Sequence, residues 1–324
     1  MPSPDLQGGL FAGRSDSSEH HPRLEVELAD APRVAGLYVR GAVRSARLAA
    51  ANRAHADEPR RGTLADVDLV TRGVRVDADR LTAYQHLLGE SAADVLPAGF
   101  VHVLAFPVAI ALMVRADFPL PFVGMVHLAN AIEQRRPLLL GDVLEVRAYA
   151  RGLRAHRSGT QVDLVTEVRA GAGELAWRGV STYLAKGTVL AGADDDEPAA
   201  HPAPGAPTFA PPAPTGRWRL SADVGRRYAA VSGDRNPIHV SALAARAFGF
   251  PRAIAHGMYT ASRALATVGS ARTDAFTWTV EFGAPVLLPA TVAVRVAPTG
   301  TGTDYAGWDP RTGRLHLAGT VAPS

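Results

Sequence analysis

A degenerate internal repeat constrains the fold of this 324-residue chain more than any other feature does. The segments LPAGFVHVL (residues 96–104) and FPRAIAHGM (residues 250–258) each carry a proline at the second position and continue into an apolar run. Two further pairs of matching segments stand in the same order along the chain: residues 83–84 with 227–228, and residues 132–139 with 280–287. Matching order over three anchors indicates two supersecondary units built on one plan.

Each unit combines one long apolar helix with a run of strands. Apolar and polar residues alternate, as they do in half-buried strands, over residues 143–150, 160–168, 176–184, 276–283, 291–296 and 314–321. One long helix followed by antiparallel strands is typical of an α+β fold in which the sheet wraps around the helix. His102 and Pro107 interrupt the apolar helix of the first unit, residues 98–114, so we expect a buried core helix rather than a membrane span.

Composition divides the chain into four parts: a disordered N-terminus (1–22), an N-terminal unit (23–186), a Pro/Ala-rich extended linker (187–216) and a C-terminal unit (217–324). Within the N-terminal unit, residues 34–54 have the length of a helix. Gly36 and Gly41 weaken that assignment, so the structure of this segment is left open.

Charge and cysteine content exclude several classes of function. The formal net charge is +3 and the arginines are scattered, which argues against a nucleic-acid-binding surface. The absence of cysteine excludes disulfides, Cys-based zinc sites and thiol nucleophiles. The N-terminal residues lack a basic segment followed by an apolar run, so we expect a cytoplasmic protein without a membrane partner.

The segment SGDRNPIH, residues 232–239, places a carboxylate and an imidazole on one short turn. In isolation the run SGDRNP is typical of a tight turn, because Asp and Asn side chains bond to nearby backbone groups and proline fixes φ. Pro237 disfavours helix at Asn236, so we expect an extended chain that carries Ile238 inward and presents His239. Ser241 is then a candidate N-cap for a short helix that ends at Gly249.

The turn has a catalytic interpretation as well as a structural one. Asp234 and His239, five residues apart across a rigid turn, are able to hold one water and remove its proton. A metal site formed by these two residues and His256 is an alternative. No compact ligand motif supports it, and we predict that no metal is bound.

His256 and Gly257 stand at the expected start of the second apolar helix. Gly257 either allows close helix packing or offers an unobstructed N–H to a carbonyl oxygen, as an oxyanion hole assisted by the helix dipole. In the repeat alignment His102 and Val103 occupy the matching positions, in a half that lacks the Asp and His of the turn. We therefore interpret His256 as structural rather than catalytic.

Tyr228, SGDRNPIH (232–239), AFGF (247–250) and IAHGM (254–258) together resemble the hydratase 2 motif of MaoC-like (R)-specific enoyl-CoA hydratases. The resemblance extends over roughly residues 65–324 and implies a double hotdog, with a degenerate N-terminal hotdog and an active C-terminal one. The segment GESAADVLPAGF stands where the first half would carry the catalytic loop. Many members carry an acidic residue where this chain has Ser241, which puts one secondary hydrogen bond in doubt.

The resemblance implies a substrate, a reaction and roles for the motif residues. A trans-2-enoyl thioester would be hydrated to an (R)-3-hydroxyacyl thioester by a water that Asp234 and His239 activate. Asn236 would position the His239 side or the water, and the Gly257 N–H would stabilise the charge on the thioester oxygen. The residues expected to contact substrate are Ser232, Gly233, Ile238, His256 and Met258. The expected partner is an acyl-CoA or acyl-carrier-protein thioester, with no cofactor beyond the CoA of the substrate. The protein would be a monomeric pseudo-dimer or a homodimer.

Two alternatives on the same fold remain open at this stage. One is an acyl-thioester-binding protein without turnover, and the other is a thioesterase. Loss of the enoyl chromophore indicates hydration, whereas release of a free thiol indicates thioester hydrolysis.

Overall fold

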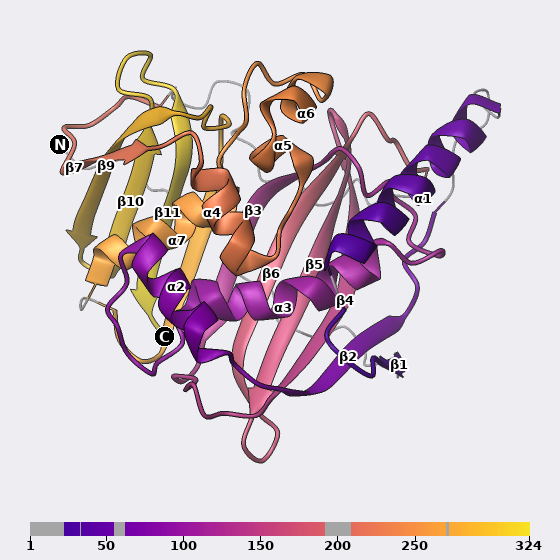
Figure 1. Cartoon of the computed structure of the whole chain (residues 1–324), viewed down its shortest axis with the longest axis horizontal. Helices are drawn as coiled ribbons and strands as arrows, with labels where there is room; N and C mark the ends of the chain where they lie inside the picture. The colour runs from indigo at the N-terminus through magenta and orange to yellow at the C-terminus, as the bar shows by residue number, and fades with distance from the viewer. Residues whose placement is uncertain (1–22, 33, 55–61, 192–208, 270–271) are drawn as a thin grey trace.

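A computed structural model describes residues 23–32, 34–54, 62–191, 209–269 and 272–324 of the chain. The protein is α+β: within the described residues, eleven strands form one continuous sheet, and helices lie against it (Figure 1). The predicted disordered N-terminus and most of the predicted linker fall outside these residues, so the division of the chain at 186 and 217 stays a prediction.

The sheet runs through both halves of the chain without a break. From one edge to the other, its strands are β1 (Leu24–Glu27), β2 (Val67–Val74), β4 (Leu144–His156), β5 (Gly159–Ala170), β6 (Glu174–Lys186), β3 (Met125–Gln134), β8 (Phe276–Phe282), β11 (Leu315–Pro323), β10 (Gly302–Trp308), β9 (Ala290–Thr299) and β7 (Gly216–Leu220). The halves meet where β3 pairs antiparallel with β8, with Asn130 opposite Val280. All six strands predicted from alternation are present, several of them longer than expected.

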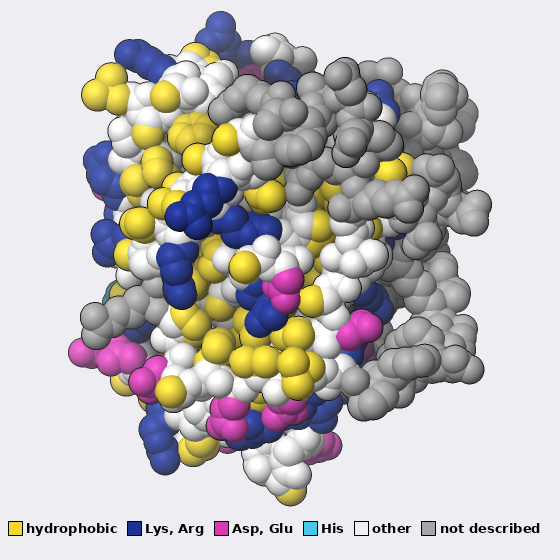
Figure 2. All heavy atoms as spheres, turned by 90° about the vertical axis from the view of Figure 1, so that its right-hand side faces the viewer, with side chains coloured by type: hydrophobic (Ala, Val, Ile, Leu, Met, Phe, Trp, Pro, Cys, Tyr) yellow, Lys and Arg dark blue, Asp and Glu magenta, His cyan; other side chains and the backbone are white. Residues whose placement is uncertain are grey.

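The edge of the sheet in the first half is closed by a short parallel strand and a network of ion pairs. β1 pairs in parallel with β2, and Arg72 on β2 bonds to Glu25 and Glu27 of β1 and to Glu145 of β4. Figure 2 shows this side of the molecule, where basic and acidic side chains mingle with hydrophobic ones. Such pairs are partly exposed, so each contributes little to stability, but together they fix β1 at the edge.

Two central helices lie against the sheet, α3 (Ala98–Met113) in the first half and α7 (Gly257–Val268) in the second. All but two of the sixteen residues of α3 are buried, which confirms the predicted core helix. The two helices approach closely at Gly99, because a Cβ there would lie 2.3 Å from Ser262 Oγ and would force a neighbouring side chain to shift. Among the described residues, no helix is both long and apolar enough to cross a membrane.

Two smaller helices complete the layer above the sheet. α2 (Ala78–Leu88) packs against α4 (Val224–Ser232), so the first half and the second half contact each other through helices as well as through the sheet (Figure 1). Arg80 of α2 donates to the carbonyl oxygen of Val231 at 2.7 Å, near the C-terminal end of α4. A cation at this end of a helix is favourable, because the last carbonyl groups carry the negative end of the helix dipole.

Equivalent backbone contacts fix how the two repeats align, and they correct the alignment made from sequence. In the first half Leu96 N–H donates to the Leu138 carbonyl, and in the second half Ala255 N–H donates to the Val286 carbonyl. The same pattern recurs nearby. Leu140 N–H donates to the Asp94 carbonyl in the first half, and Leu288 N–H donates to the Ala253 carbonyl in the second half. Pro97 is thus the counterpart of His256.

This register makes Ala98, rather than Val103, the counterpart of Gly257. The sequence alignment paired Gly257 with Val103, five residues too far along the first half, because it matched Pro97 with Pro251. Pro97 is the N-cap residue of α3, whereas Pro251 lies in a loop ahead of α7. The argument that His256 is structural because His102 matches it therefore fails.

The segment left open in the sequence analysis forms a helix, α1 (Val34–Ala54). It packs against α3 and the loop that follows it (Figure 1). Gly41 lies at the contact: a Cβ there would stand 2.3 Å from the Phe122 ring. The glycine that weakened the helix assignment is therefore needed for packing, and packing outweighs its low helix propensity.

Candidate active site

The turn between α4 and the next helix is held by its own side chains. Ser232 Oγ accepts from Asp234 N–H at 3.1 Å, Asp234 Oδ1 accepts from Asn236 N–H at 3.1 Å, and Asn236 Oδ1 accepts from Ile238 N–H at 3.3 Å. Gly233, with φ of 77°, ends α4 in the left-handed region that glycine tolerates. The structural interpretation of SGDRNP as a tight turn is therefore confirmed, and the same residues carry the chemistry.

One expectation about this turn is wrong. Residues 237–240 form a short helix, α5 (Pro237–Val240), rather than an extended chain. Asn236 is non-helical, with φ of −53° and ψ of 124°, as the following proline requires. Proline itself is favoured at the first position of a helix, where its missing N–H costs no hydrogen bond. The next helix, α6 (Ala242–Ala247), begins at Ser241, whose Oγ accepts from Ala244 N–H, and this confirms the predicted N-cap.

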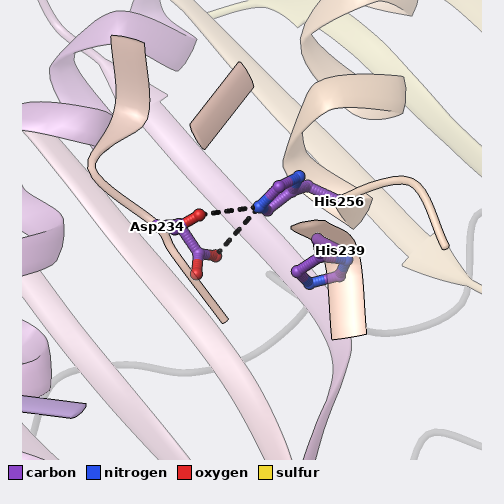
Figure 3. A group of neighbouring side chains, drawn as sticks. All are labelled: Asp234, His239 and His256. Atoms are coloured by element: carbon purple, nitrogen blue, oxygen red, sulfur yellow. Dashed lines mark hydrogen bonds and ion pairs between the residues drawn. The ribbon is translucent and has the colours of Figure 1, made fainter. Parts of the chain in front are cut away.

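Asp234, His239 and His256 meet in one cluster (Figure 3). One side-chain nitrogen or oxygen from each lies within 4.8 Å of the others, and the two imidazole rings stack with centroids 3.8 Å apart. Figure 3 shows the Asp234 carboxylate directed toward the two rings. The spacing suits one water held between the carboxylate and an imidazole.

The hydrogen bonds of His239 decide which nitrogen is available for chemistry. Its Nδ1 lies 2.9 Å from the Ile254 carbonyl oxygen. A carbonyl oxygen only accepts, so Nδ1 carries the proton in this pair and the neutral ring has its lone pair on Nε2. His239 is therefore a candidate general base with a fixed tautomer.

His256 supports the turn from the other side. Its Nε2 lies 3.0 Å from the Asp234 backbone oxygen and 3.8 Å from Asp234 Oδ2. Nε2 must carry the proton for the first contact, because the backbone oxygen is an acceptor. Tyr228 packs its ring 4.9 Å from that of His256 and closes the other face. His256 thus holds Asp234 in place and stacks on His239.

The same protonation pattern bears on metal binding. A metal at the cluster would need a lone pair from His256 Nε2, which instead donates to the Asp234 backbone. The remaining donors are the Asp234 carboxylate and His239 Nε2, fewer than a structural or catalytic zinc site uses. The absence of a bound metal stays a prediction, and the hydrogen bonds favour acid–base chemistry.

Burial and neighbouring groups tune the pKa values of the cluster. Burial alone would raise the pKa of Asp234, but His256, His239, the Tyr38 hydroxyl and the Asn236 N–H outweigh it and lower the pKa below its ordinary value. Burial lowers the pKa of His239, and it lowers the pKa of His256 to about 3. At neutral pH the cluster therefore holds an ionised carboxylate beside a neutral imidazole, the state that accepts a proton.

Gly257 is the first residue of α7 and follows His256 directly. The N–H groups of the first helical turn have no partner within the helix, and the helix dipole adds positive potential there. A Cβ at Gly257 would lie 3.0 Å from the Phe282 ring, so glycine leaves the helix start uncrowded. The N-terminus of α7 thus begins next to the cluster, as the oxyanion interpretation requires.

Comparisons with known proteins place the chain in a family. A family model described as MaoC like domain matches residues 205–307. The 3-hydroxyacyl-thioester dehydratase X of Mycobacterium tuberculosis (strain ATCC 25618 / H37Rv) is 38% identical over 264 residues, which are 81% of this chain and 91% of that protein. The chain belongs to the MaoC-like hydratase and dehydratase family. It is therefore an enzyme of the carbon–oxygen lyase type, as the resemblance predicted.

Solved structures, some of them named as MaoC-like, share the fold. The crystal structure of HtdX from Mycobacterium tuberculosis has a TM-score of 0.69 and 35% identity, covering 79% of this chain and 100% of that one. A MaoC-like dehydratase from Phytophthora capsici has a TM-score of 0.64 and 18% identity, covering 79% of this chain and 95% of that one. A Mycobacterium tuberculosis protein described as a double hotdog has a TM-score of 0.50 and 16% identity, covering 81% and 96%. The predicted double hotdog is confirmed.

Two residues at this MaoC-like site escaped the sequence analysis. Tyr38 of α1 donates its hydroxyl proton to Asp234 Oδ1, from 196 residues away in the chain. Gly225 lies within α4, where a Cβ would stand 2.1 Å from the His239 carbonyl oxygen. A glycine inside a helix that packs closely was a usable signal for Gly225. No local pattern marks Tyr38.

The remaining predicted contacts have defined places, but nothing tests their role in binding substrate. Ser232 is buried and bonds within the turn, and Gly233 ends α4. Ile238 is half-buried in α5. Met258 is buried, and its Sδ lies 3.5 Å from the amide nitrogen of Asn130 on β3. Their contacts with substrate stay predictions.

Proposed function

We propose that the protein catalyses the reversible, (R)-specific hydration of trans-2-enoyl thioesters to (R)-3-hydroxyacyl thioesters. The observation that carries the proposal is the cluster itself: an ionised Asp234 and a neutral His239 face each other beside the N-terminus of α7. A carboxylate and an imidazole in these states accept and return protons at neutral pH. The family relationship to a 3-hydroxyacyl-thioester dehydratase supports the same reaction.

The proposed mechanism uses one water and one oxyanion donor. Asp234 and His239 hold the water and together accept the proton of one O–H bond, which breaks as the water oxygen forms a bond to C3 of the enoyl thioester. The electron pair of the double bond moves toward the thioester oxygen, where the Gly257 N–H stabilises the charge. The proton taken from water then returns to C2, which restores the thioester. Dehydration follows the same steps in reverse.

The thioester carrier is either CoA or acyl carrier protein, and the chemistry at the cluster is the same for both. No cofactor is required, because the two side chains supply both proton transfers and CoA enters only as part of the substrate. We place the enzyme in the cytoplasm, in fatty acid metabolism. The pairing of β3 with β8 joins the repeats as a pseudo-dimer within one chain.

A direct assay tests the proposal. Crotonyl-CoA and longer trans-2-enoyl-CoA substrates are mixed with the enzyme, and the loss of the enoyl absorbance is followed. We expect hydration, with a product of (R) configuration by chiral analysis. Release of free thiol without loss of the enoyl group would identify a thioesterase instead. Binding without either reaction would identify a non-catalytic acyl-thioester-binding protein.

The pKa values of the cluster predict the pH dependence of hydration. The active form has Asp234 ionised and His239 neutral, so protonation of either group abolishes activity. Both groups have pKa values below their ordinary ones, which moves the loss of activity to lower pH. We therefore expect kcat/KM to stay constant as pH falls through about 6.5, the ordinary pKa of histidine, and to decrease only below it. A profile that already falls above pH 7 would contradict this assignment of protonation states.

A further inference from the structure

Helix α1 belongs to the N-terminal unit and yet reaches the cluster in the C-terminal repeat. Tyr38 on α1 donates its hydroxyl proton to Asp234 Oδ1. Val34, at the start of the same helix, lies against the turn: a Cβ on Gly233 would stand 3.6 Å from its Cγ2. Thus α1 contacts the catalytic turn through two residues.

The packing of α1 fixes where Tyr38 lies. Arg44, which follows Tyr38 in the same helix, donates to carbonyl oxygens of the loop that follows α3, at 3.1 Å to Leu120 and 3.3 Å to Ala116. Ser45 Oγ accepts from Val123 N–H of the same loop at 2.9 Å. The Tyr38 ring packs on Phe122 with centroids 5.2 Å apart. The hydroxyl is therefore held by contacts that are independent of the turn.

The two oxygens of the Asp234 carboxylate have different surroundings. Oδ1 accepts two hydrogen bonds, one from the Tyr38 hydroxyl and one from Asn236 N–H. Oδ2 lies 3.8 Å from His256 Nε2, beyond hydrogen-bond distance. A carboxylate oxygen that already accepts two bonds is a weaker proton acceptor than its partner. Oδ2 is thus left as the oxygen that faces the reacting water.

We propose that Tyr38 is a positioning residue that holds Asp234 Oδ1, so that Oδ2 is the oxygen that takes part in proton transfer. The proposal rests on the proposed function, because it assigns Asp234 to that reaction. Burial, together with the charge of Asp234, raises the pKa of Tyr38, which keeps the hydroxyl protonated and able to donate. The active site of the C-terminal repeat is therefore completed by a helix of the N-terminal unit.

The test is the variant Tyr38→Phe, which keeps the ring against Phe122 and removes only the hydroxyl. We expect kcat/KM for crotonyl-CoA to fall by about 10- to 100-fold, the range for a hydrogen bond to a charged group. Tyr38 lowers the pKa of Asp234, so its loss raises that pKa and moves the Asp234 step of the acidic limb to higher pH, while the His239 step stays in place. A merely structural role would lower activity without moving the limb. Tyr149→Phe, the same change on β4, is the matched control and should leave both unchanged.

A double-mutant cycle separates a specific effect from a general loosening. In an Asp234→Asn background, Tyr38→Phe should lower kcat/KM much less than it does in the wild type. The reason is that residue 234 then has no charged carboxylate for the Tyr38 hydroxyl to hold. If Tyr38→Phe lowers kcat/KM by the same factor in both backgrounds and the pH profile does not move, the proposal is overturned. If Tyr38→Phe does not fold, Arg44→Met loosens α1 and keeps the hydroxyl; its acidic limb must then move upward for the proposal to stand. Wild-type enzyme that fails to hydrate enoyl-CoA refutes the proposed function instead, so the two failures are distinguishable.

Discussion

Replacing Asp234 with Asn, or His239 with Ala, should lower kcat for hydration of crotonyl-CoA by about 10² to 10⁴, the range that positioned acid–base groups supply. Asn is unable to accept the proton of water, although its Oδ1 still accepts from the Asn236 N–H that holds the turn. Ala at position 239 removes Nε2, the nitrogen of the His239 ring whose lone pair is left free when Nδ1 donates to the Ile254 carbonyl. The measurement is the initial rate of loss of the enoyl absorbance at saturating substrate.

The matched control is Asp223→Asn, which makes the same chemical change at the other end of α4. Asp223 is partly exposed and accepts a hydrogen bond from Ser221, outside the cluster. It should keep wild-type kcat. The double variant Asp234→Asn/His239→Ala should be little worse than the more damaging single variant, because residues that act as a unit are not additive. Wild-type kcat in either single variant, with the fold intact by circular dichroism, would remove the assignment of the base.

Local patterns were sufficient for much of the fold. β4 and β8, both found by alternation, have one face toward the helices, with buried residues at every second position over more than half of each strand. The core helix was readable because α3 is apolar around its whole circumference, as a fully enclosed helix must be. In both cases the environment of the element is uniform along its length, and the sequence repeats with the period of the element.

Two features of the fold were not predicted correctly from the sequence: strand β3 and the register of the repeat. β3 runs through the centre of the sheet between β6 and β8, and its sequence, MVHLANAIEQ, does not alternate between apolar and polar residues. The register of the repeat failed for a different reason. Pro97 and Pro251 look equivalent in the sequence, but the second repeat carries the catalytic turn and α6 ahead of its helix, so its proline lies further from the helix start.

In the active site, too, the residues that local sequence places were predictable, and the residue that long-range packing places was not. Asp234, Asn236 and His239 were predictable because they lie within six residues on one turn, and their geometry follows from local hydrogen bonds. Tyr38 was not predictable, because its contact with Asp234 exists only once α1 has packed on the loop after α3. Long-range packing of this kind leaves no periodic trace in either segment.

Replacing Gly257 with Pro should lower kcat by about 10² to 10³, the effect of removing one oxyanion donor. At this position, proline removes the N–H and is otherwise compatible with the backbone. Proline is favoured at the first residue of a helix, and His256 already has the extended backbone that a following proline requires, with φ of −63° and ψ of 137°. The N–H is therefore removed without breaking α7. KM should change less than kcat, because the oxyanion forms only along the reaction path.

Gly257→Ala is the control for this variant, because alanine adds the same Cβ near the Phe282 ring and keeps the N–H. The ring has to shift slightly for either variant, since the Cβ would lie 3.0 Å from its nearest atoms. A loss shared equally by Ala and Pro would mean that crowding, not the donor, is responsible. A large loss in Pro with near wild-type kcat in Ala would assign the charge of the enolate oxygen to the amide at the start of α7.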